Sequence, residues 1–187
     1  MPDALDKVQS QISQALAKSD IVVTIGGSSV GVKDFVPDAI NALGKPGVVV
    51  QGILLRPGAI SGFGIINSKP VVMLPGHIGS CIAGFYLFVA PLICSYIGAE
   101  GDGLLPLVRA ELAHDLENGP QFRFLLVSVE RVDGKLVATH VEGGSSALST
   151  IIKSHGYTIV PPHAKIASGE GIDVYLFGKL ELAQIRG

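Results

Sequence analysis

The glycine-rich stretch after the first apolar run constrains this chain most. Residues 21–25, IVVTI, are apolar and mostly β-branched, and GGSSVG follows directly at residues 26–31. A helical pattern of apolar residues then runs from about residue 34 to residue 43. Glycines permit positive φ and a close approach of ligand to backbone, and the free N–H groups at a helix start attract oxyanions. The stretch predicts a strand, an anion-binding turn and a helix.

A second stretch of the same kind follows. Residues 71–74, VVML, lead into PGHIGS at residues 75–80 and then into an apolar helical pattern. In open α/β sheets, turns at the carboxyl ends of neighbouring strands line one crevice, where ligands bind. Either turn alone is also compatible with a tight connection, so it is the pair that predicts a site. Its candidate ligand-binding residues are Gly26, Gly27, Ser28, Ser29, Gly31, Pro75, Gly76, His77 and Ser80.

The composition of the chain argues against two classes of function, nucleic-acid binding and binding to anionic membranes. The 187 residues are 48% hydrophobic with a formal net charge of −2, which indicates a folded chain without the basic surface of a nucleic-acid or anionic-membrane binder. Cys81 and Cys94 lack metal or disulfide spacing and are expected to be reduced thiols of a cytoplasmic protein. The apolar run 81–97 contains Gly84 and Pro91 and is expected to be a core helix kinked near Pro91, not a membrane span.

The spacing of apolar runs and turn residues changes at residues 98–103, and this change predicts two domains, residues 1–103 and 104–187. The first reads as a helix, a strand, the glycine turn and its helix, a buried strand at 47–55, a hairpin joining 63–66 to 71–74, and the apolar helix. We expect a mainly parallel sheet that is incomplete at its N-terminal side. Residues 98–103, GAEGDG, form the expected linker, and short strand patterns beyond it predict a small antiparallel β-domain with one helix at 147–153.

The chain resembles the C-terminal part of the MoeA-type molybdopterin molybdenumtransferases, the family that includes the gephyrin E domain. The matching segments are DIVVTIGGSSVG at 20–31 with Asp34, LRPG at 55–58, GFG at 62–64, LPG at 74–76 with Ser80, and, in the β-domain, GS at 144–145, LS at 148–149 and GY at 156–157. The resemblance spans nearly all of this chain, which is less than half of a full family member.

The resemblance implies a three-layer molybdopterin-binding α/β domain followed by a β-barrel-like domain, and a homodimer. The implied reaction is insertion of molybdate into adenylylated molybdopterin, with Mg²⁺ assistance and release of AMP. In that scheme residues 26–31 hold phosphate, Asp34 is a metal or molybdate carboxylate, and Arg56 stands where the family usually has a lysine. Ser80 and the turn at Pro75 shape the same crevice, and Ser145 contributes from the second domain.

Departures from the family pattern keep a second function open. The usual PGNPVS turn reads PGHIGS here, and a usual basic residue near Arg56 is Ala59. The chain is therefore either part of an enzyme or a non-catalytic phosphopterin- or nucleotide-binding or scaffold module. Individual residues also have simpler interpretations: Asp34 as a helix N-cap, Arg56 as a solvated charge and His77 as a polar turn residue.

Overall fold

The computed structural model describes residues 2–27, 35–99, 105–143 and 148–178. By their internal contacts these residues form two compact units. One consists of the described residues of 1–53 and 58–93, and the other of Leu54–Pro57 and the described residues from Cys94 on. The division falls between residues 93 and 94; the expected boundary at residue 103 lies outside the described residues.

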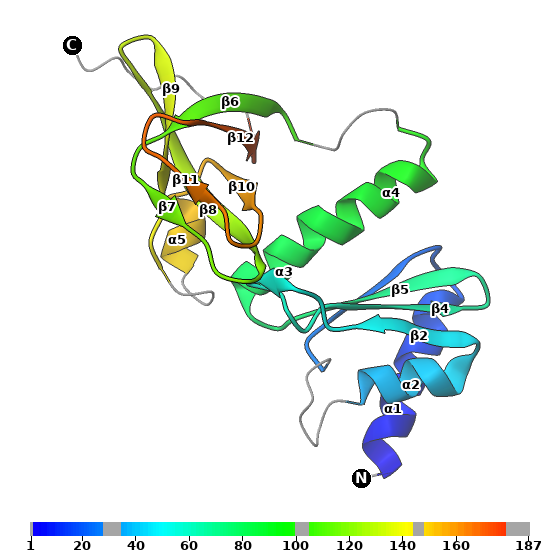
Figure 1. The fold of residues 1–187 in the computed structure, drawn as a ribbon. Helices are drawn as coiled ribbons and strands as arrows, with labels where there is room; N and C mark the ends of the chain where they lie inside the picture. Colours follow the sequence, from blue (N-terminus) through cyan, green and yellow to red (C-terminus); the bar gives the residue numbers. More distant parts are fainter. Residues whose placement is uncertain (1, 28–34, 100–104, 144–147, 179–187) are drawn as a thin grey trace. The chain divides into compact units, whose positions relative to one another are not determined.

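The first unit is an α/β/α arrangement around a four-stranded sheet (Figure 1). The strands run in the order β1, β5, β4, β2 across the sheet. Their bounds are β1 Val22–Ile25, β2 Pro46–Gln51, β4 Gly62–Ile66 and β5 Lys69–Leu74. The helices are α1 Pro2–Leu16, α2 Val36–Leu43, α3 Ile78–Gly84 and α4 Ala90–Tyr96, with a π-helical turn, η1 Phe85–Val89, between the last two. The residues of α4 from Cys94 on belong to the second unit.

The expectation of a mainly parallel sheet is wrong. In the described part of this sheet only β1 and β5 pair in parallel, while β5–β4 and β4–β2 are antiparallel. The cause is the connection between β4 and β5, which has only two residues, Asn67 and Ser68, with φ of 49° and 66°. Such a turn reverses the chain at once, so the strands it joins must run antiparallel. The α/β class is confirmed, with a mixed sheet.

Each face of this sheet buries its own cluster. Ile12 of α1 and Ala39 and Ile40 of α2 pack against Val71 and Met73 on one face. Val72 and Leu74, which point the other way along the same strand, pack with Val89, Phe88 and Leu92 of the long helical stretch. The alternation along β5 therefore places a helical layer on each side of the sheet, which is the expected three-layer arrangement.

The helical stretch Ile78–Tyr96 is irregular just before Pro91. Ala90 donates its N–H to the carbonyl of Phe85, five residues back, and this defines η1. Proline has no N–H and cannot continue the regular helical ladder, so the turn before it widens. Among the described residues this is the one helix long and apolar enough to cross a membrane, a test that core helices also pass, and 39% of it is buried.

The expected buried strand at 47–55 is also wrong. β2 ends at Gln51 and is an outer strand of the described sheet, with Val49 and Val50 55% and 41% exposed and an irregular register between Val48 and Val50. Leu55 and Arg56 form a separate strand, β3, which pairs with β8 of the second unit. An apolar composition alone does not show that two short strands in one run have different partners.

The second unit is a closed five-stranded barrel with β3 added at one strand. The order β10, β12, β6, β9, β8 closes because β8 also pairs with β10. The bounds are β6 Leu107–Leu112, β7 Leu116–Glu117, β8 Phe122–Val132, β9 Lys135–His140, α5 Leu148–Ile152, β10 Gly156–Val160, β11 Lys165–Ile166 and β12 Gly171–Leu176. Most pairs are antiparallel, as expected, whereas β6 and β9 run parallel.

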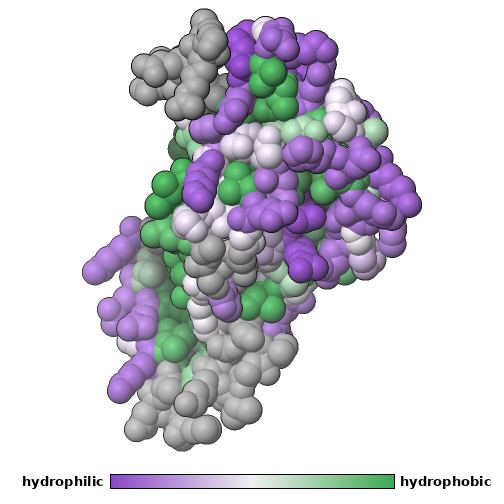
Figure 2. All heavy atoms as spheres, turned by 90° about the vertical axis from the view of Figure 1, so that its left-hand side faces the viewer, coloured by the Kyte–Doolittle hydropathy of each residue, from purple (hydrophilic) through white to green (hydrophobic). Residues whose placement is uncertain are grey.

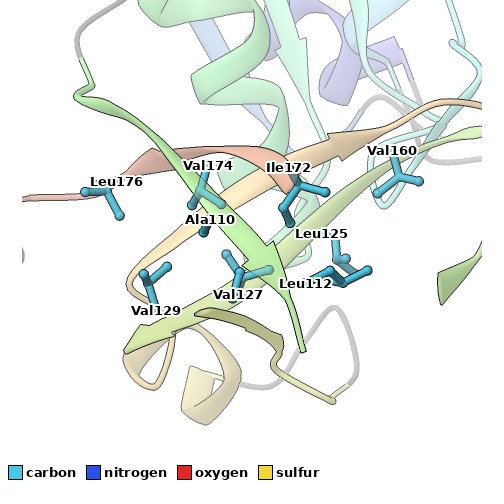
Figure 3. Packing of buried hydrophobic residues seen from close by; sticks show 10 residues of the cluster. Ala110, Leu112, Leu125, Val127, Val129, Val160, Ile172, Val174 and Leu176 are labelled. Atoms are coloured by element: carbon cyan, nitrogen blue, oxygen red, sulfur yellow. The ribbon is translucent and has the colours of Figure 1, made fainter. Parts of the chain in front are cut away.

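The barrel is filled by side chains that alternate along its strands. Leu125, Val127 and Val129 of β8 point into a core that also receives residues of every other barrel strand (Figure 3). In this view Leu112, Leu125 and Val160 lie at one end of the core, and Val129 and Leu176 lie at the other. At the surface, apolar side chains emerge in patches between hydrophilic ones on the face drawn in Figure 2.

Candidate functional site

The two glycine turns predicted from the sequence are neighbours in the first unit. Ile25 and Leu74 are register partners at the carboxyl ends of the parallel pair β1 and β5. The Gly26 N–H donates to the Leu74 carbonyl over 2.9 Å. A Cβ built on Gly76 would lie 3.7 Å from the Cα of Gly26. The backbones of the two turns therefore touch, as expected for turns at one sheet edge.

The conformation of the first turn requires glycine at two positions. Gly26 and Gly27 have φ of 80° and 69°, values that side-chain-bearing residues rarely adopt. The Val36 N–H, at the start of α2, donates to the Gly27 carbonyl over 3.3 Å. A Cβ on Gly27 would also lie 2.9 Å from Val36 Cγ2. The described ends of the loop thus meet at the N-terminus of α2, where the helix dipole favours an anion.

The second turn leads into α3. Pro75 is buried, whereas Gly76 and His77 are exposed. His77 is the N-cap residue of α3, and its carbonyl accepts the N–H of Cys81 over 2.8 Å, without a side-chain cap. Ser80 is 8% exposed in the first turn of the helix. The exposed His77 ring and the exposed Gly76 backbone are the groups of this turn that a ligand could reach.

Several predicted site residues lie outside the described residues: Ser28, Ser29, Gly31, Asp34 and Ser145. The alternative interpretation of Asp34 as a helix N-cap lies outside the described residues as well. In the described part, α2 begins at Val36, and its N-cap residue is Phe35.

Arg56 belongs to the second unit, in β3. It is exposed and is the register partner of Arg123 in the parallel pairing of β3 and β8. Arg123 is half-buried, and its Nη2 lies 3.4 Å from Nε2 of His140. Burial and then the charge of Arg56 lower the pKa of Arg123. Burial and then the charge of Arg123 lower the pKa of His140, while Glu142 opposes this shift.

Sequence reasoning missed Arg123 and His140 as site candidates. Arg123 lies on the same face of β8 as the inward-facing Leu125, Val127 and Val129, so a charged residue in that apolar pattern was an available signal.

His140 was considered only as a possible ligand of a zinc site. In the part of the chain that the structure describes, no three His, Cys, Asp and Glu side chains gather to hold a metal ion.

Known proteins match the chain over nearly its whole length. A Methanocaldococcus jannaschii protein provisionally named a molybdopterin biosynthesis protein is 34% identical over 93% of this chain and 40% of its own length. The molybdopterin molybdenumtransferase of Bacillus subtilis is 31% identical over 93% of this chain and 41% of its own length. The crystal structure of a MoeA molybdopterin biosynthesis protein from Pyrococcus horikoshii superposes with a TM-score of 0.74 at 31% identity, covering 91% of this chain and 40% of that one.

These matches agree with the two units of the fold. The chain spans about 40% of the length of the curated relatives that it matches. A family described as the MoeA C-terminal region (domain IV) matches residues 109–177, which hold the barrel. The family described as "Probable molybdopterin binding domain" matches residues 1–94, which hold the sheet and both glycine turns. The chain belongs to this molybdopterin-binding family and carries a MoeA-type C-terminal region after it.

Proposed function

We propose that this chain acts in molybdenum cofactor biosynthesis as part of a molybdopterin molybdenumtransferase. It binds adenylylated molybdopterin, and molybdate is inserted into the pterin dithiolene with release of AMP. The observation that carries the proposal is the contact between the Gly26 and Gly76 turns at the carboxyl ends of β1 and β5. Glycine turns at a helix start suit a phosphate group, which this substrate carries.

The residues take separate roles in this proposal. The backbone at residues 26–31 and at Gly76 binds and orients the phosphate, and His77 borders it. Asp34 and the ligand's phosphate oxygens together hold Mg²⁺, which supplies charge neutralisation when bound. Arg56 is the proposed catalytic cation, and Ser145 is a proposed ligand-binding residue. The proposed setting is cytoplasmic, with the homodimer as the assembled form.

A non-catalytic phosphopterin-binding or scaffold module is the second candidate. It is favoured by His77, Ile78 and Gly79 within the altered turn and by Ala59 in place of a basic residue. Both candidates bind the phosphate, so a binding assay tests the shared site. Molybdate insertion, followed by release of AMP, separates them.

The first prediction concerns Asp34. Titration calorimetry with AMP should show that Mg²⁺ raises the affinity of the wild type by about tenfold, which corresponds to about 1.4 kcal/mol. Asp34→Asn should remove this metal dependence, because an amide is a poor Mg²⁺ ligand. Asp38→Asn is the matched control, since Asp38 is an exposed carboxylate in the first turn of α2, four residues after Asp34 in the sequence.

Three results would contradict the proposed site. A metal dependence that persists in Asp34→Asn would exclude Asp34 as the metal carboxylate. Loss of the dependence in Asp38→Asn as well would show a general effect of charge at α2. Absence of AMP binding by every variant would leave the glycine turns as structural connections only.

A further inference from the structure

One side-chain amide joins the segments that meet at one end of the barrel. Asn118 follows β7, and its Nδ2 donates to the Gln121 carbonyl, just before β8, over 2.9 Å. The same Nδ2 also donates to the carbonyls of Val160 and Pro161, at the end of β10, over 3.2 and 2.7 Å. Three carbonyl oxygens around one atom require the NH₂ side of the amide, because the Oδ1 side has no hydrogen to donate. The amide of Asn118 therefore connects the start of β8 to the end of β10.

Backbone hydrogen bonds hold the same junction closed. The Asn118 N–H donates to the Ala164 carbonyl over 2.9 Å, and the His163 N–H donates to the Gly119 carbonyl over 2.8 Å. The short strands β7 and β11 pair on either side of these bonds (Figure 1). Val160, whose carbonyl the amide contacts, lies at one end of the barrel core in Figure 3. The junction thus restrains both the Asn118 side chain and the backbone beside it.

The residue after Asn118 makes this asparagine chemically reactive. The peptide nitrogen that follows an asparagine can attack the side-chain carbonyl carbon, and glycine hinders this attack least because it has no Cβ. Gly119 is exposed, and a Cβ built on it would meet no atom within 4 Å. The other two asparagines of the chain, Asn41 and Asn67, precede an alanine and a serine. Asn118 is therefore the asparagine whose following residue best permits this reaction.

We propose that Asn118 is a site of spontaneous deamidation, with water as the co-reactant, and that the closed junction sets the rate of the reaction. The Gly119 backbone nitrogen, after losing its proton to solvent base, forms a bond to Cγ of Asn118. The bond from Cγ to Nδ2 then breaks, and Nδ2 takes up a proton and leaves with the electron pair as ammonia. Water opens the resulting succinimide at either carbonyl, which gives aspartate or isoaspartate.

The junction and the reaction affect each other. Hydrogen bonds that fix the amide and the neighbouring backbone restrict the rotation that brings Cγ of Asn118 to the Gly119 nitrogen, so local opening precedes ring closure. After the reaction a carboxylate, which can only accept hydrogen bonds, faces the three carbonyl oxygens. The donor that connected β8 to β10 is then lost, so the modified junction opens more readily.

The second prediction compares the folded chain with the chain unfolded in guanidinium chloride, both at mildly alkaline pH. Mass spectrometry of proteolytic peptides measures the loss of ammonia at each asparagine. In the unfolded chain, Asn118 should react faster than Asn67, because glycine follows it. Folding should slow the reaction at Asn118 by about tenfold or more, since ring closure then requires local opening.

Gly119→Ala is the matched control for the chemistry. The added Cβ would meet no atom within 4 Å, so the variant should melt at the wild-type temperature. In the unfolded state, however, the methyl group beside the attacking nitrogen should slow the loss of ammonia at Asn118. A Gly119→Ala chain that reacts as fast as the wild type when unfolded would show that the succinimide route is not used.

A thermal melt tests the consequence for the fold. Asn118→Asp carries the side chain of one reaction product and should melt below the wild type, because its carboxylate replaces the donor to three carbonyls. Asn67→Asp should melt at the wild-type temperature. Asn67 is an exposed turn residue with φ of 49°, a conformation that aspartate also adopts, so the two variants make the same chemical change.

The proposal is overturned by any of three further results. An unfolded chain that loses ammonia no faster at Asn118 than at Asn67 would exclude Asn118 as the reactive site. Equal rates at Asn118 in the folded and unfolded chain would show that the junction does not set the rate. Equal melting temperatures of Asn118→Asp and the wild type would show that the amide does not hold the junction closed.

Discussion

Single side chains set the local electrostatics of this molecule. Burial raises the pKa of the Cys81 thiol, so little reactive thiolate forms near neutral pH. His155 has a different role, because its Nδ1 accepts the N–H of Val129 over 2.8 Å and thereby satisfies a backbone donor of β8. His140, by contrast, meets the cationic Arg123, and its pKa is lowered by burial and by that charge.

The third prediction concerns the pH dependence of stability. The pKa of His140 in the folded chain lies below its ordinary value of 6.5. Between these two values the unfolded chain binds more protons, so stability is present above about pH 6.5 and falls as pH decreases through this window. His140→Gln should therefore lose less stability between pH 7.5 and 5.5 than the wild type. The difference should be small, because solvent screens the half-buried ring.

Urea unfolding at the two pH values measures this difference. His114→Gln provides the control, since His114 is an exposed histidine of the same unit. A loss of stability in His140→Gln equal to that of the wild type would show that other groups govern this pH range.

At the scale of elements, closing the barrel depends on a residue without a side chain. Gly156 begins β10 and is the register partner of both Val127 in β8 and Leu176 in β12. A Cβ on Gly156 would lie 2.2 Å from the Tyr175 carbonyl oxygen and 3.0 Å from its carbon. These are backbone atoms of a barrel strand, so they cannot move aside without disturbing the pairing.

The fourth prediction follows from this close approach. Gly156→Ala should lower the free energy of unfolding by about 3 kcal/mol, since overpacking forces the strands apart. Gly119→Ala should change it little, because a Cβ there would meet no atom within 4 Å. Denaturant unfolding followed by circular dichroism measures both variants. Equal free energies of unfolding for the two variants would mean that β10 accommodates the added methyl group without weakening its pairing, and would contradict the prediction.

At the scale of the whole molecule, the first unit exposes apolar side chains on its outer strands. Val23 and Ile25 of β1 are 37% and 65% exposed, and Val49 and Val50 of β2 are 55% and 41% exposed. β1 and β2 are the end strands in the order of the described sheet. Exposed apolar residues on outer strands favour pairing with another chain.

The fifth prediction is self-association. Sedimentation velocity at micromolar concentration should show a species of twice the chain mass, because a homodimer would cover the apolar residues of at least one of these outer strands. Replacing both Ile25 and Val49 by Lys should shift the equilibrium toward the monomer, since charges on strand edges oppose pairing. A wild-type monomer throughout this concentration range would contradict the prediction.

Much of the fold follows from local sequence patterns. The two-residue turn at Asp133 and Gly134 is confirmed, with φ of 48° and 81°, as is the short helix α5. The contact between the two glycine turns also follows from the sequence, because both turns come after apolar strands that pair in parallel. Alternation, turn residues and short connections act over a few residues, so the sequence displays them directly.

Only the tertiary structure decided which strands meet over long separations. Leu55 and Arg56 are separated from β2 because they pair with Phe122 and Arg123, more than sixty residues later. The same pairing makes the two arginines register partners, and the antiparallel pairing of β8 with β9 brings His140 within 3.4 Å of Arg123. A strand's local pattern shows which face is apolar, but its partner depends on competition among all strands of the fold. The sequence by itself therefore determined most of the elements and the closeness of the two glycine turns, whereas the separate pairing of β3 with β8 required the tertiary structure.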